Sequence, residues 1–356
     1  MKNPTVQFFI VLLLPESKAK LMINLEISPY KLSDNSDALK LEDMCPQGKA
    51  LSLRFVRPTF HARSEVYQDY RILTAKSNNK LIGVAAGAKK KIKVGGEIIY
   101  AIYGYDLRVH PDYRKYGTAK VLTEAVIKEF GDVIDCAYTL IAGENESALS
   151  FIKRSFGAKV VIPLTYLILP VYRRIKESLK FQFTSASEIH YAYIQKNPGI
   201  EFLSEFDEKY LLGHVNSISL GQKAGCSIWT NENLISEQVV KIPVHFNLIR
   251  LLFNPLKLFM KFPSVPKQDE IIQSWFLYDL YAEDINGLKE ILSAVNNFAY
   301  SKGKKFIYIL LQTNDPLIKL VQKSRLLLFT YPYFFLANKK IFPKSSNKIY
   351  IDIRDL

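Results

Sequence analysis

The pattern of apolar and polar residues in the first half of the chain predicts alternating strands and helices. Residues 97–109, EIIYAIYGYDLRV, are rich in Ile and Tyr and are typical of a buried strand. From Val121 to Phe130, apolar side chains recur at helical spacing on one face. The turn Ser77-Asn78-Asn79 predicts a hairpin. The other expected elements are strands at 25–30, 71–76 and 80–88, strands beginning near Cys136 and Lys159, and helices at 35–44 and around Ala148.

The second half repeats this order of elements. Residues 271–281, IIQSWFLYDLY, predict an apolar and aromatic strand, and residues 285–300 predict an amphipathic helix. We therefore expect an internal repeat of structure, with its seam at 170–180. The segment 58–70 has no clear period. The expected domains are an N-terminal extension at 1–22, a first domain at 23–170 and a second at 171–356, the latter ending in a strand at 306–311, a helix at 315–323 and a strand at 326–337.

The polar segment between the long strand and its helix is the most informative part of the chain. It has the spacing Arg-x-x-Gly-x-Ala over Arg114, Lys115, Tyr116, Gly117, Thr118 and Ala119. The start of a helix leaves N–H groups unpaired and carries partial positive charge, so it binds anions. Gly117 and Ala119 leave room for the backbone to approach a phosphate, while Arg114 and Lys115 add positive charge. The pattern indicates a pyrophosphate-binding loop.

A second block follows at 136–169 and predicts a strand, a turn, a helix and a strand. Asn145 and Ala148 lie at the expected start of the helix, and Gly157 follows it. Asn is common at helix starts because its side chain caps free N–H groups. Asn145 is therefore interpreted as a helix cap, as a ligand contact, or as both.

These two blocks together resemble the GNAT acetyltransferases, whose acyl-CoA loop and second block have these patterns. The resemblance implies an α/β fold with a mixed sheet, present as two tandem GNAT-like domains of which the second is degenerate. The chain is also similar to tandem GNAT proteins typified by the plant hookless-type proteins. That likeness is carried by Pro170-Val171-Tyr172, by Ser227 and Trp229, by Lys261, Pro263, Ser264 and Pro266, and by Asp352, Arg354, Asp355 and Leu356.

The resemblance implies acetyl-CoA as the co-substrate, with no metal. The pantetheine arm is expected along Leu107, Arg108 and Val109, where the strand would splay from its neighbour. The pyrophosphate is expected on residues 114–119. Asn145, Ala148 and Phe151 are expected to complete the cofactor site.

The catalytic groups are less defined. Tyr103 stands where relatives place a glutamate base, and Tyr105 and Asp106 are nearby alternatives; strand packing explains all three equally well. His61, in the aperiodic segment, is a further possible base. Ile152 stands where relatives place a tyrosine that protonates the leaving thiolate.

The second half lacks the chemistry of the loop. After Tyr281 the sequence reads AEDINGLKE, so Glu283 and Asp284 put negative charge where a phosphate would lie. Two anions at close range repel by about 1 kcal/mol or more. We therefore expect the second half to bind no CoA and to shape the acceptor groove of the first.

Composition changes this picture little. The 356 residues include 48 Lys and Arg against 34 Asp and Glu, a net charge of +14, with basic clusters at 89–93 and at Arg173, Arg174 and Lys176. The absence of a basic helix with interleaved aromatics gives no reason to expect a nucleic-acid partner. The three cysteines are far apart, which fits no zinc pattern and favours a reducing, cytoplasmic setting. The apolar run at 8–14 is shorter than the ~20 residues of a membrane span, and Met22 is taken as the natural start of the protein.

Two functions follow from these observations. The first is an N-acetyltransferase that joins acetyl-CoA and a primary amine in a ternary complex. The second is a regulatory or scaffolding protein with a CoA site but little or no activity, suggested by the residues found at Tyr103 and Ile152. The acceptor amine and the oligomeric state are left open.

Overall fold

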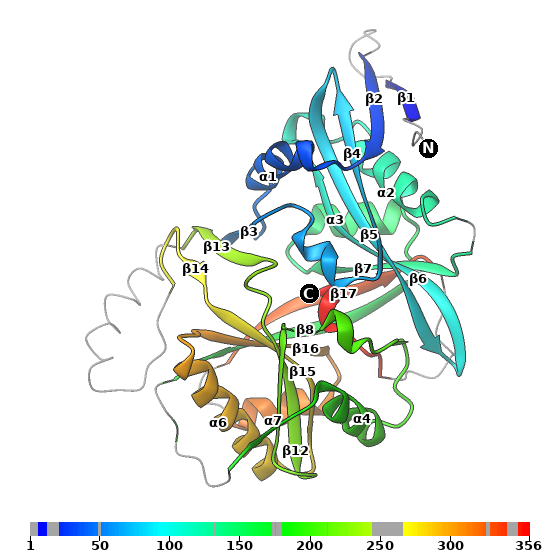
Figure 1. The fold of residues 1–356 in the computed structure, drawn as a ribbon. Helices are drawn as coiled ribbons and strands as arrows, with labels where there is room; N and C mark the ends of the chain where they lie inside the picture. Colours follow the sequence, from blue (N-terminus) through cyan, green and yellow to red (C-terminus); the bar gives the residue numbers. More distant parts are fainter. Residues whose placement is uncertain are drawn as a thin grey trace.

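A computed structural model describes residues 6–12, 21–48, 51–131, 133–172, 175, 180–211, 213–243, 266–324, 328–339 and 348–356, with the side chains of 6–12 and 21–23 excepted. Within these ranges the fold is mixed α/β, built on one large sheet in the order β1-β2-β4-β5-β6-β7-β17-β8-β16-β15-β12-β11-β9. The sheet runs through both halves of the chain, and the C-terminus lies between the halves (Figure 1). The basic residues Arg173, Arg174 and Lys176 and the motif residues Lys261, Pro263 and Ser264 lie outside the described residues.

The first half confirms the elements expected from its hydrophobic pattern. The long strand predicted at 97–109 is β6 (Glu97–Val109), and the predicted hairpin turns at Asn78 and Asn79, both with positive φ. The strands are β1 (Val6–Leu12), β2 (Leu21–Pro29), β3 (Ser52–Val56), β4 (Asp69–Ser77), β5 (Lys80–Val94), β7 (Cys136–Ala142) and β8 (Val160–Pro170); the helices are α1 (Asn35–Asp43), α2 (Thr118–Lys128) and α3 (Glu146–Arg154), with short 3-10 turns η1 (Leu32–Asp34), η2 (Ala62–Val66) and η3 (Pro111–Tyr113).

The second half contains the predicted helices and some elements that the pattern did not indicate. The expected strand at 271–281 is two strands, because the Gln273 carbonyl accepts hydrogen bonds from the N–H groups of Lys305 and Phe306 and the chain changes sheets there. The strands are β9 (Gln182–Thr184), β10 (Leu203–Ser204), β11 (Val215–Ser219), β12 (Ala224–Trp229), β13 (Ser236–Lys241), β14 (Ile271–Ile272), β15 (Ser274–Ala282), β16 (Phe306–Gln312) and β17 (Phe329–Ala337); the helices are α4 (Ala186–Lys196), α6 (Ile285–Ser301) and α7 (Pro316–Ser324), with 3-10 turns η4 (Glu208–Tyr210) and η5 (Ile353–Asp355).

The two halves exchange their last strands. β17 comes from the second half, yet it lies between β7 and β8, with Tyr333 paired to Ala142 on one side and to Leu164 on the other. In turn, β8 from the first half pairs with β16 along its length. A small second sheet, β14-β13-β3, joins the halves again. The boundary expected near residue 170 thus separates two series of elements along the chain. In space, however, the strands on its two sides belong to one continuous sheet.

The strands β6 and β15 share one backbone feature. Asp106 and Asp279, each within a Tyr-Asp-Leu sequence, have φ of 51° and 50°, in the left-handed region that residues other than Gly seldom adopt. Both strands bulge at this point against their antiparallel neighbours. Both also pair with a parallel neighbour only before the bulge, β6 with β7 over Ala101–Tyr103 and β15 with β16 over Ser274–Leu277. The two strands thus have the same bulge followed by the same divergence.

Helices with one apolar face cover the sheet as their spacing predicts. In α2, the buried Leu122 and Val126 pack with Ile82 and Ile102 of the sheet. In α6, Leu288, Ile291 and Val295 pack in the same way with the strands of the second half. Each buried aliphatic side chain of this kind contributes roughly 1.5–3 kcal/mol.

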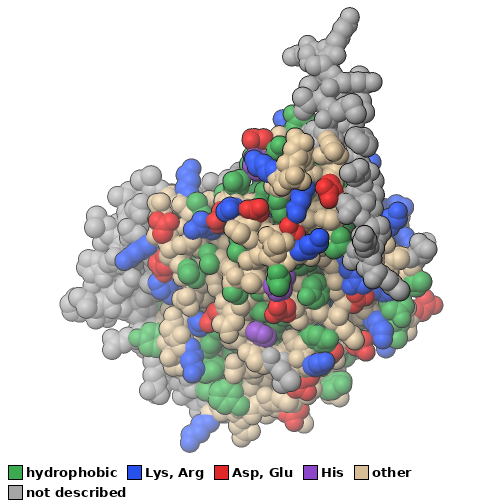
Figure 2. All heavy atoms as spheres, turned by 45° about the horizontal axis from the view of Figure 1, so that its top comes forward, with side chains coloured by type: hydrophobic (Ala, Val, Ile, Leu, Met, Phe, Trp, Pro, Cys, Tyr) green, Lys and Arg blue, Asp and Glu red, His purple; other side chains and the backbone are tan. Residues whose placement is uncertain are grey.

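The apolar run near the start of the chain forms an edge strand. Val6–Leu12 pairs antiparallel with β2, with Phe8 opposite Leu25. Within the described residues, no helix is long and apolar enough to cross a membrane. On the face shown in Figure 2, basic and acidic side chains are interspersed, without a continuous basic area. Lys90, in the basic cluster at 89–93, is buried and ion-paired to Asp352 and Asp355.

Candidate acyl-CoA site

The divergence of β6 from β7 opens a notch in the sheet. The parallel pairing ends at Tyr103 opposite Tyr138, so Leu107 to Val109 have no partner strand on the β7 side. The expected splay is therefore present. The Val109 carbonyl accepts a hydrogen bond from Arg114 Nε at 3.2 Å, so this arginine of the loop folds back onto the notch.

The loop after β6 has the backbone that the glycine pattern predicts. Gly117 is the N-cap of α2 with φ of 77°, and no side chain caps this end of the helix. Lys115 also has positive φ, of 73°. Because the cap residue carries no side-chain acceptor, no side chain occupies the N–H groups at the start of α2, which is the arrangement that binds anions in other proteins. The buried Thr118 hydroxyl has no hydrogen-bond partner within the described part of the chain.

One cavity of about 1060 Å³ joins the notch to the loop, a size at the upper end of small-molecule sites. The predicted site residues that it brings together lie up to 48 positions apart in the sequence, from Tyr103 to Phe151. Tyr116 does not line it. The predicted site residues that do are Tyr103, Tyr105, Asp106, Leu107, Arg108, Val109, Arg114, Lys115, Gly117, Thr118, Ala119, Asn145, Ala148 and Phe151.

Asn145 is a helix cap as well as a cavity residue. Its side-chain oxygen accepts a hydrogen bond from the Ala148 N–H at 3.2 Å, at the start of α3. The capping interpretation is thus confirmed, and the lining position leaves the ligand contact in place as a prediction. Ile152, expected where relatives carry a proton-donating tyrosine, also lines the cavity.

Each of the three candidate bases is engaged in a hydrogen bond or an ion pair, and none of them is ready to accept a proton. The Tyr103 hydroxyl donates to the Asp355 carbonyl, and burial raises the pKa of Tyr103 far above its usual value. Tyr105 donates to Ser64 Oγ at 2.8 Å, and burial likewise raises its pKa. Asp106 accepts from Arg57 Nη1 at 2.6 Å; although burial opposes this, the neighbouring arginines hold the Asp106 pKa well below its usual range. The expectation of a base among these residues finds no support in this geometry.

A buried ionic cluster surrounds Asp106. Arg57 is bonded to both Glu42 oxygens and to Asp106. Arg63 and Arg108 approach the same carboxylates from the cavity side. Arg57 and Arg63 flank the start of the aperiodic segment 58–70, and the pattern gave them no role. The only sign of this cluster in the sequence was the presence of two arginines at a segment that lacks a hydrophobic period.

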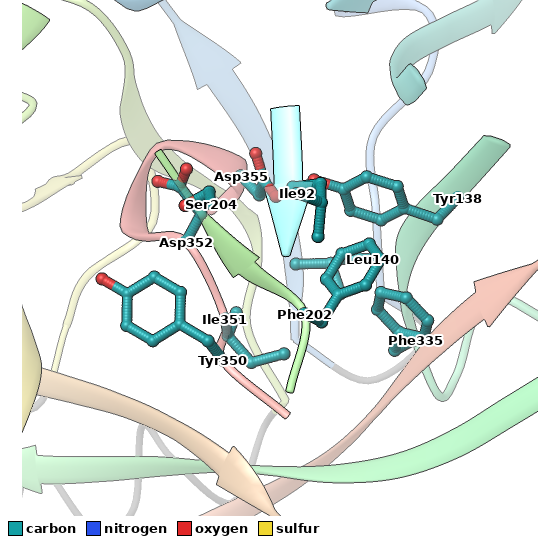
Figure 3. A pocket seen from close by; sticks show the side chains of 10 residues that line it. All are labelled: Ile92, Tyr138, Leu140, Phe202, Ser204, Phe335, Tyr350, Ile351, Asp352 and Asp355. Atoms are coloured by element: carbon teal, nitrogen blue, oxygen red, sulfur yellow. Dashed lines mark hydrogen bonds between the residues drawn. The ribbon is translucent and has the colours of Figure 1, made fainter. Parts of the chain in front are cut away.

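The C-terminal segment closes the back of the site. Asp355 accepts hydrogen bonds from Tyr138 at 2.7 Å and from Lys90 at 2.8 Å, and Arg63 donates to its carbonyl at 3.0 Å. Figure 3 shows Tyr138 and the two aspartates, Asp352 and Asp355, around a packed group of aromatic residues. The tail residues that carry the resemblance described above therefore also have a structural role.

The corresponding notch of the second half is filled. β15 and β16 diverge beyond Leu277 opposite Ile309, but residues 348–351 enter the gap and leave a space of only about 40 Å³. The Ile349 N–H donates to Gln312 Oε1 at 2.8 Å. At the start of α6, Asp284 Oδ1 accepts from the Gly287 N–H at 2.7 Å. The start of α6 is thus capped by a carboxylate of the protein itself, whereas the start of α2 has no side-chain cap.

The cysteines and possible metal ligands add no chemistry to the site. Cys136 and Cys226 are buried, as expected, and Cys45 lines the cavity 3.4 Å from Arg114 Nη2. Among the described residues, no group of His, Cys, Asp and Glu has the arrangement of a metal site. His61 faces Glu65, at 3.3 Å, rather than the notch residues.

Comparisons with known proteins agree with this architecture. Residues 39–158 match the model of the acetyltransferase (GNAT) family, while no curated protein sequence matches the chain. Among solved structures, Saccharomyces cerevisiae N-myristoyltransferase with bound myristoyl-CoA superposes with a TM-score of 0.60 at 10% identity, covering 95% of this chain and 88% of that one. A putative acetyltransferase from Pyrococcus horikoshii gives a TM-score of 0.53 at 12% identity, covering 93% and 95%.

A third structure contains a GCN5-related glucosamine N-acetyltransferase region within a fungal multi-domain GH3 β-N-acetylglucosaminidase. It gives a TM-score of 0.54 at 15% identity and covers 91% of this chain but 39% of that one. At sequence identities this low, the comparison shows similarity of fold only. The matched segment at 39–158 includes the notch, the loop and α3. The family model and the shared architecture together support a GNAT-superfamily fold for this chain.

Proposed function

We propose that the protein is a CoA-dependent N-acyltransferase that transfers an acetyl group from acetyl-CoA to a primary amine. The observation that carries this proposal is the contrast between the two copies of the notch. In the first copy the helix start is uncapped and faces a large cavity; in the second it is capped by Asp284 and the notch is filled. Acyl-CoA as donor is also in keeping with the myristoyl-CoA bound to the yeast structure.

In this proposal the cofactor is held mainly by backbone groups. The pyrophosphate lies on the amides at the start of α2, beside Lys115. Pantetheine runs along Leu107 to Val109 as an added strand, because that edge has no partner on the β7 side. A backbone N–H at this edge polarises the thioester carbonyl.

The reaction is direct transfer within a ternary complex. The amine nitrogen attacks the thioester carbon, the C–N bond forms and the C–S bond breaks. CoA leaves as a thiolate, whose parent thiol has a pKa near ~8.5, so departure without a proton donor at Ile152 costs little. The amine proton passes to water in the open cavity, since Tyr103, Tyr105 and Asp106 are already engaged.

Calorimetry with CoA tests the cofactor site. We expect micromolar binding to the wild-type protein and a loss of at least tenfold in Gly117→Glu, because the new carboxylate repels the pyrophosphate. Gly131→Glu is the matched control: Gly131 has φ of 78° just beyond α2, is exposed and does not line the cavity. Absence of CoA binding to the wild-type protein, or equal binding by both variants, would contradict the proposal.

A second candidate is a CoA-binding protein without transferase activity. The engaged state of the three candidate bases favours it. Release of free thiol from acetyl-CoA in the presence of a panel of primary amines distinguishes the two: only the first candidate gives turnover.

The remaining expectations belong to the same proposal. Residues 171–356 are a second GNAT-like copy without a CoA site, joined to a first copy at 23–170, with 1–22 as an extension. The chain is a tandem GNAT protein similar to the hookless-type group, and it acts in the cytoplasm.

A further inference from the structure

Two buried arginines in the cavity wall have donors without partners. Arg63 comes from η2 and Arg108 from β6, and both line the cavity. Arg63 is 8% exposed and the Arg108 side chain is 10% exposed. Within the described part of the chain, Nε of each is buried and has no hydrogen-bond partner. Buried polar atoms of this kind are rare in native structures, so each one requires an explanation.

The neighbouring Arg57 shows what a purely structural arginine in this cluster looks like. It donates to both oxygens of Glu42, to Asp106 and to the Phe60 carbonyl, and it does not line the cavity. By contrast, Arg63 and Arg108 approach the two carboxylates only at 3.5 to 3.9 Å. Three arginines face Glu42 and Asp106, and the two with the longer ion pairs, Arg63 and Arg108, line the cavity.

The unpaired donors lie on the acceptor side of the sheet. Leu107 packs with α2, on the side expected for the cofactor. Arg108, the next residue, points to the other face, where its guanidinium lies 5.6 Å from the Phe55 ring of β3 and 3.6 Å from Glu42 of α1. An acceptor approaching the thioester from this face meets Arg63 and Arg108.

We propose that Arg63 and Arg108 form a carboxylate-binding subsite beside the reacting centre. This inference rests on the proposed acyl transfer and names a substrate class for it. A guanidinium matches a carboxylate in shape and charge, and low exposure strengthens the pair. A carboxylate held here pairs with the Nη groups of the two arginines, which lie 3.5 to 3.9 Å from Asp106 and Glu42. Asp106, which has a positive φ, lies behind the two arginines.

The carboxylate has two possible sources. It belongs to the acceptor, which is then an amino acid or a related amino acid derivative, or to the acyl group, which is then a dicarboxylic one such as succinyl. The chemistry of the subsite is the same in both cases, and the two are separated by experiment.

The acceptor arm compares the standard amino acids with their α-amides, using acetyl-CoA. The donor arm compares succinyl-CoA with acetyl-CoA, using the amides. Both arms are run with the wild-type protein, with Arg108→Gln and with Arg54→Gln. Arg54 is the matched control, because it lies on β3, bonds to Gln238 and Asp43 and does not line the cavity.

We expect kcat/KM to favour the carboxylate-bearing substrate of one arm by at least tenfold. The preference disappears in Arg108→Gln and persists in Arg54→Gln, and the affinity of Arg54→Gln for CoA stays within twofold of the wild-type value. Arg63→Lys keeps the positive charge but loses the paired N–H donors of the guanidinium, and it retains part of the preference. Equal use of both members of each pair by the wild-type protein, or a preference that survives Arg108→Gln, would overturn the subsite.

A binding measurement separates this inference from the proposed function. Calorimetry with N-acetyl amino acids and their amides, with and without CoA, requires no turnover. Tighter binding of the acids that is lost in Arg108→Gln supports the subsite even where no amine is acylated. Failure of CoA to bind contradicts the proposed function alone. The subsite is contradicted when neither pair differs in affinity: acids against amides, and succinyl-CoA against acetyl-CoA.

Discussion

At the scale of single residues, the surroundings of a side chain shift its pKa more than its amino-acid type does. Asp106 and Glu237 are both carboxylic acids, and their pKa values are shifted in opposite directions. Asp106 lies among arginines, which keep its pKa low against the effect of burial. Glu237, on β13, has a hydrogen bond with Tyr308 and lies near Tyr166 and Tyr333, with no cation among the groups that shift its pKa. Burial raises the pKa of Glu237 to about 7.

The raised pKa of Glu237 predicts a pH-dependent effect on stability. The unfolded chain has an ordinary Glu pKa near ~4.3, so the folded state binds this proton more tightly. The contribution of Glu237 is therefore complete below about pH 4 and is lost as pH rises through about 7. Relative to wild type, Glu237→Gln should gain up to about 3 kcal/mol in free energy of unfolding between pH 4 and pH 8. Urea unfolding across this range measures it.

The matched control for this prediction is Glu205→Gln. The Glu205 side chain is 64% exposed and lies 3.8 Å from Lys91, so its removal should shift the curve by a few tenths of a kcal/mol at most. Parallel pH curves for wild type and Glu237→Gln would show that Glu237 is ionised in the folded protein at neutral pH.

At the scale of elements, the sequence predicted those helices and strands whose formation depends on the local hydrophobic pattern. β6 matches its expected range because its apolar run and the flanking turn residues agree. The start of α2 has Gly117 as its cap residue, and the start of α6 is capped by Asp284, which the sequence indicated only as a charge that repels phosphate. The break at Gln273, the strand β17 inside the first sheet and the ionic cluster of Arg57 and Arg63 were not foreseen. Each depends on partners far away in the chain, which local periodicity does not encode.

The exchanged strand β17 provides a stability test at this scale. Phe335 is 1% exposed and packs against Tyr138 and Phe202, with ring centroids at 5.3 and 5.0 Å. Phe335→Ala should lower the free energy of unfolding by roughly 3–5 kcal/mol through a cavity at the join of the two halves. Phe329→Ala, in the same strand but 48% exposed, should cost under about 1 kcal/mol. Similar losses in urea titrations of the two variants would contradict this placement of β17.

At the scale of the whole molecule, the exchange of β8 and β17 makes the halves interdependent. Removing the second half leaves β8 without a partner strand, and removing the first half leaves β17 without one. The tail adds a second connection, because residues 348–351 fill the second notch while Asp355 bonds to Lys90 and Tyr138 of the first half. An open site and a filled copy thus share one core, and the second half contributes rigidity to the first.

This interdependence predicts a single unfolding transition. Both tryptophans of the chain, Trp229 and Trp275, lie in β12 and β15 of the second half and are buried. Their fluorescence therefore reports on the second half, whereas loss of CoA binding reports on the first. In urea the two signals should give coincident midpoints, and Phe335→Ala should shift both by the same amount. Two separate midpoints, or a shift confined to the CoA signal, would mean that the halves fold as independent domains and that the strand exchange adds little to their stability.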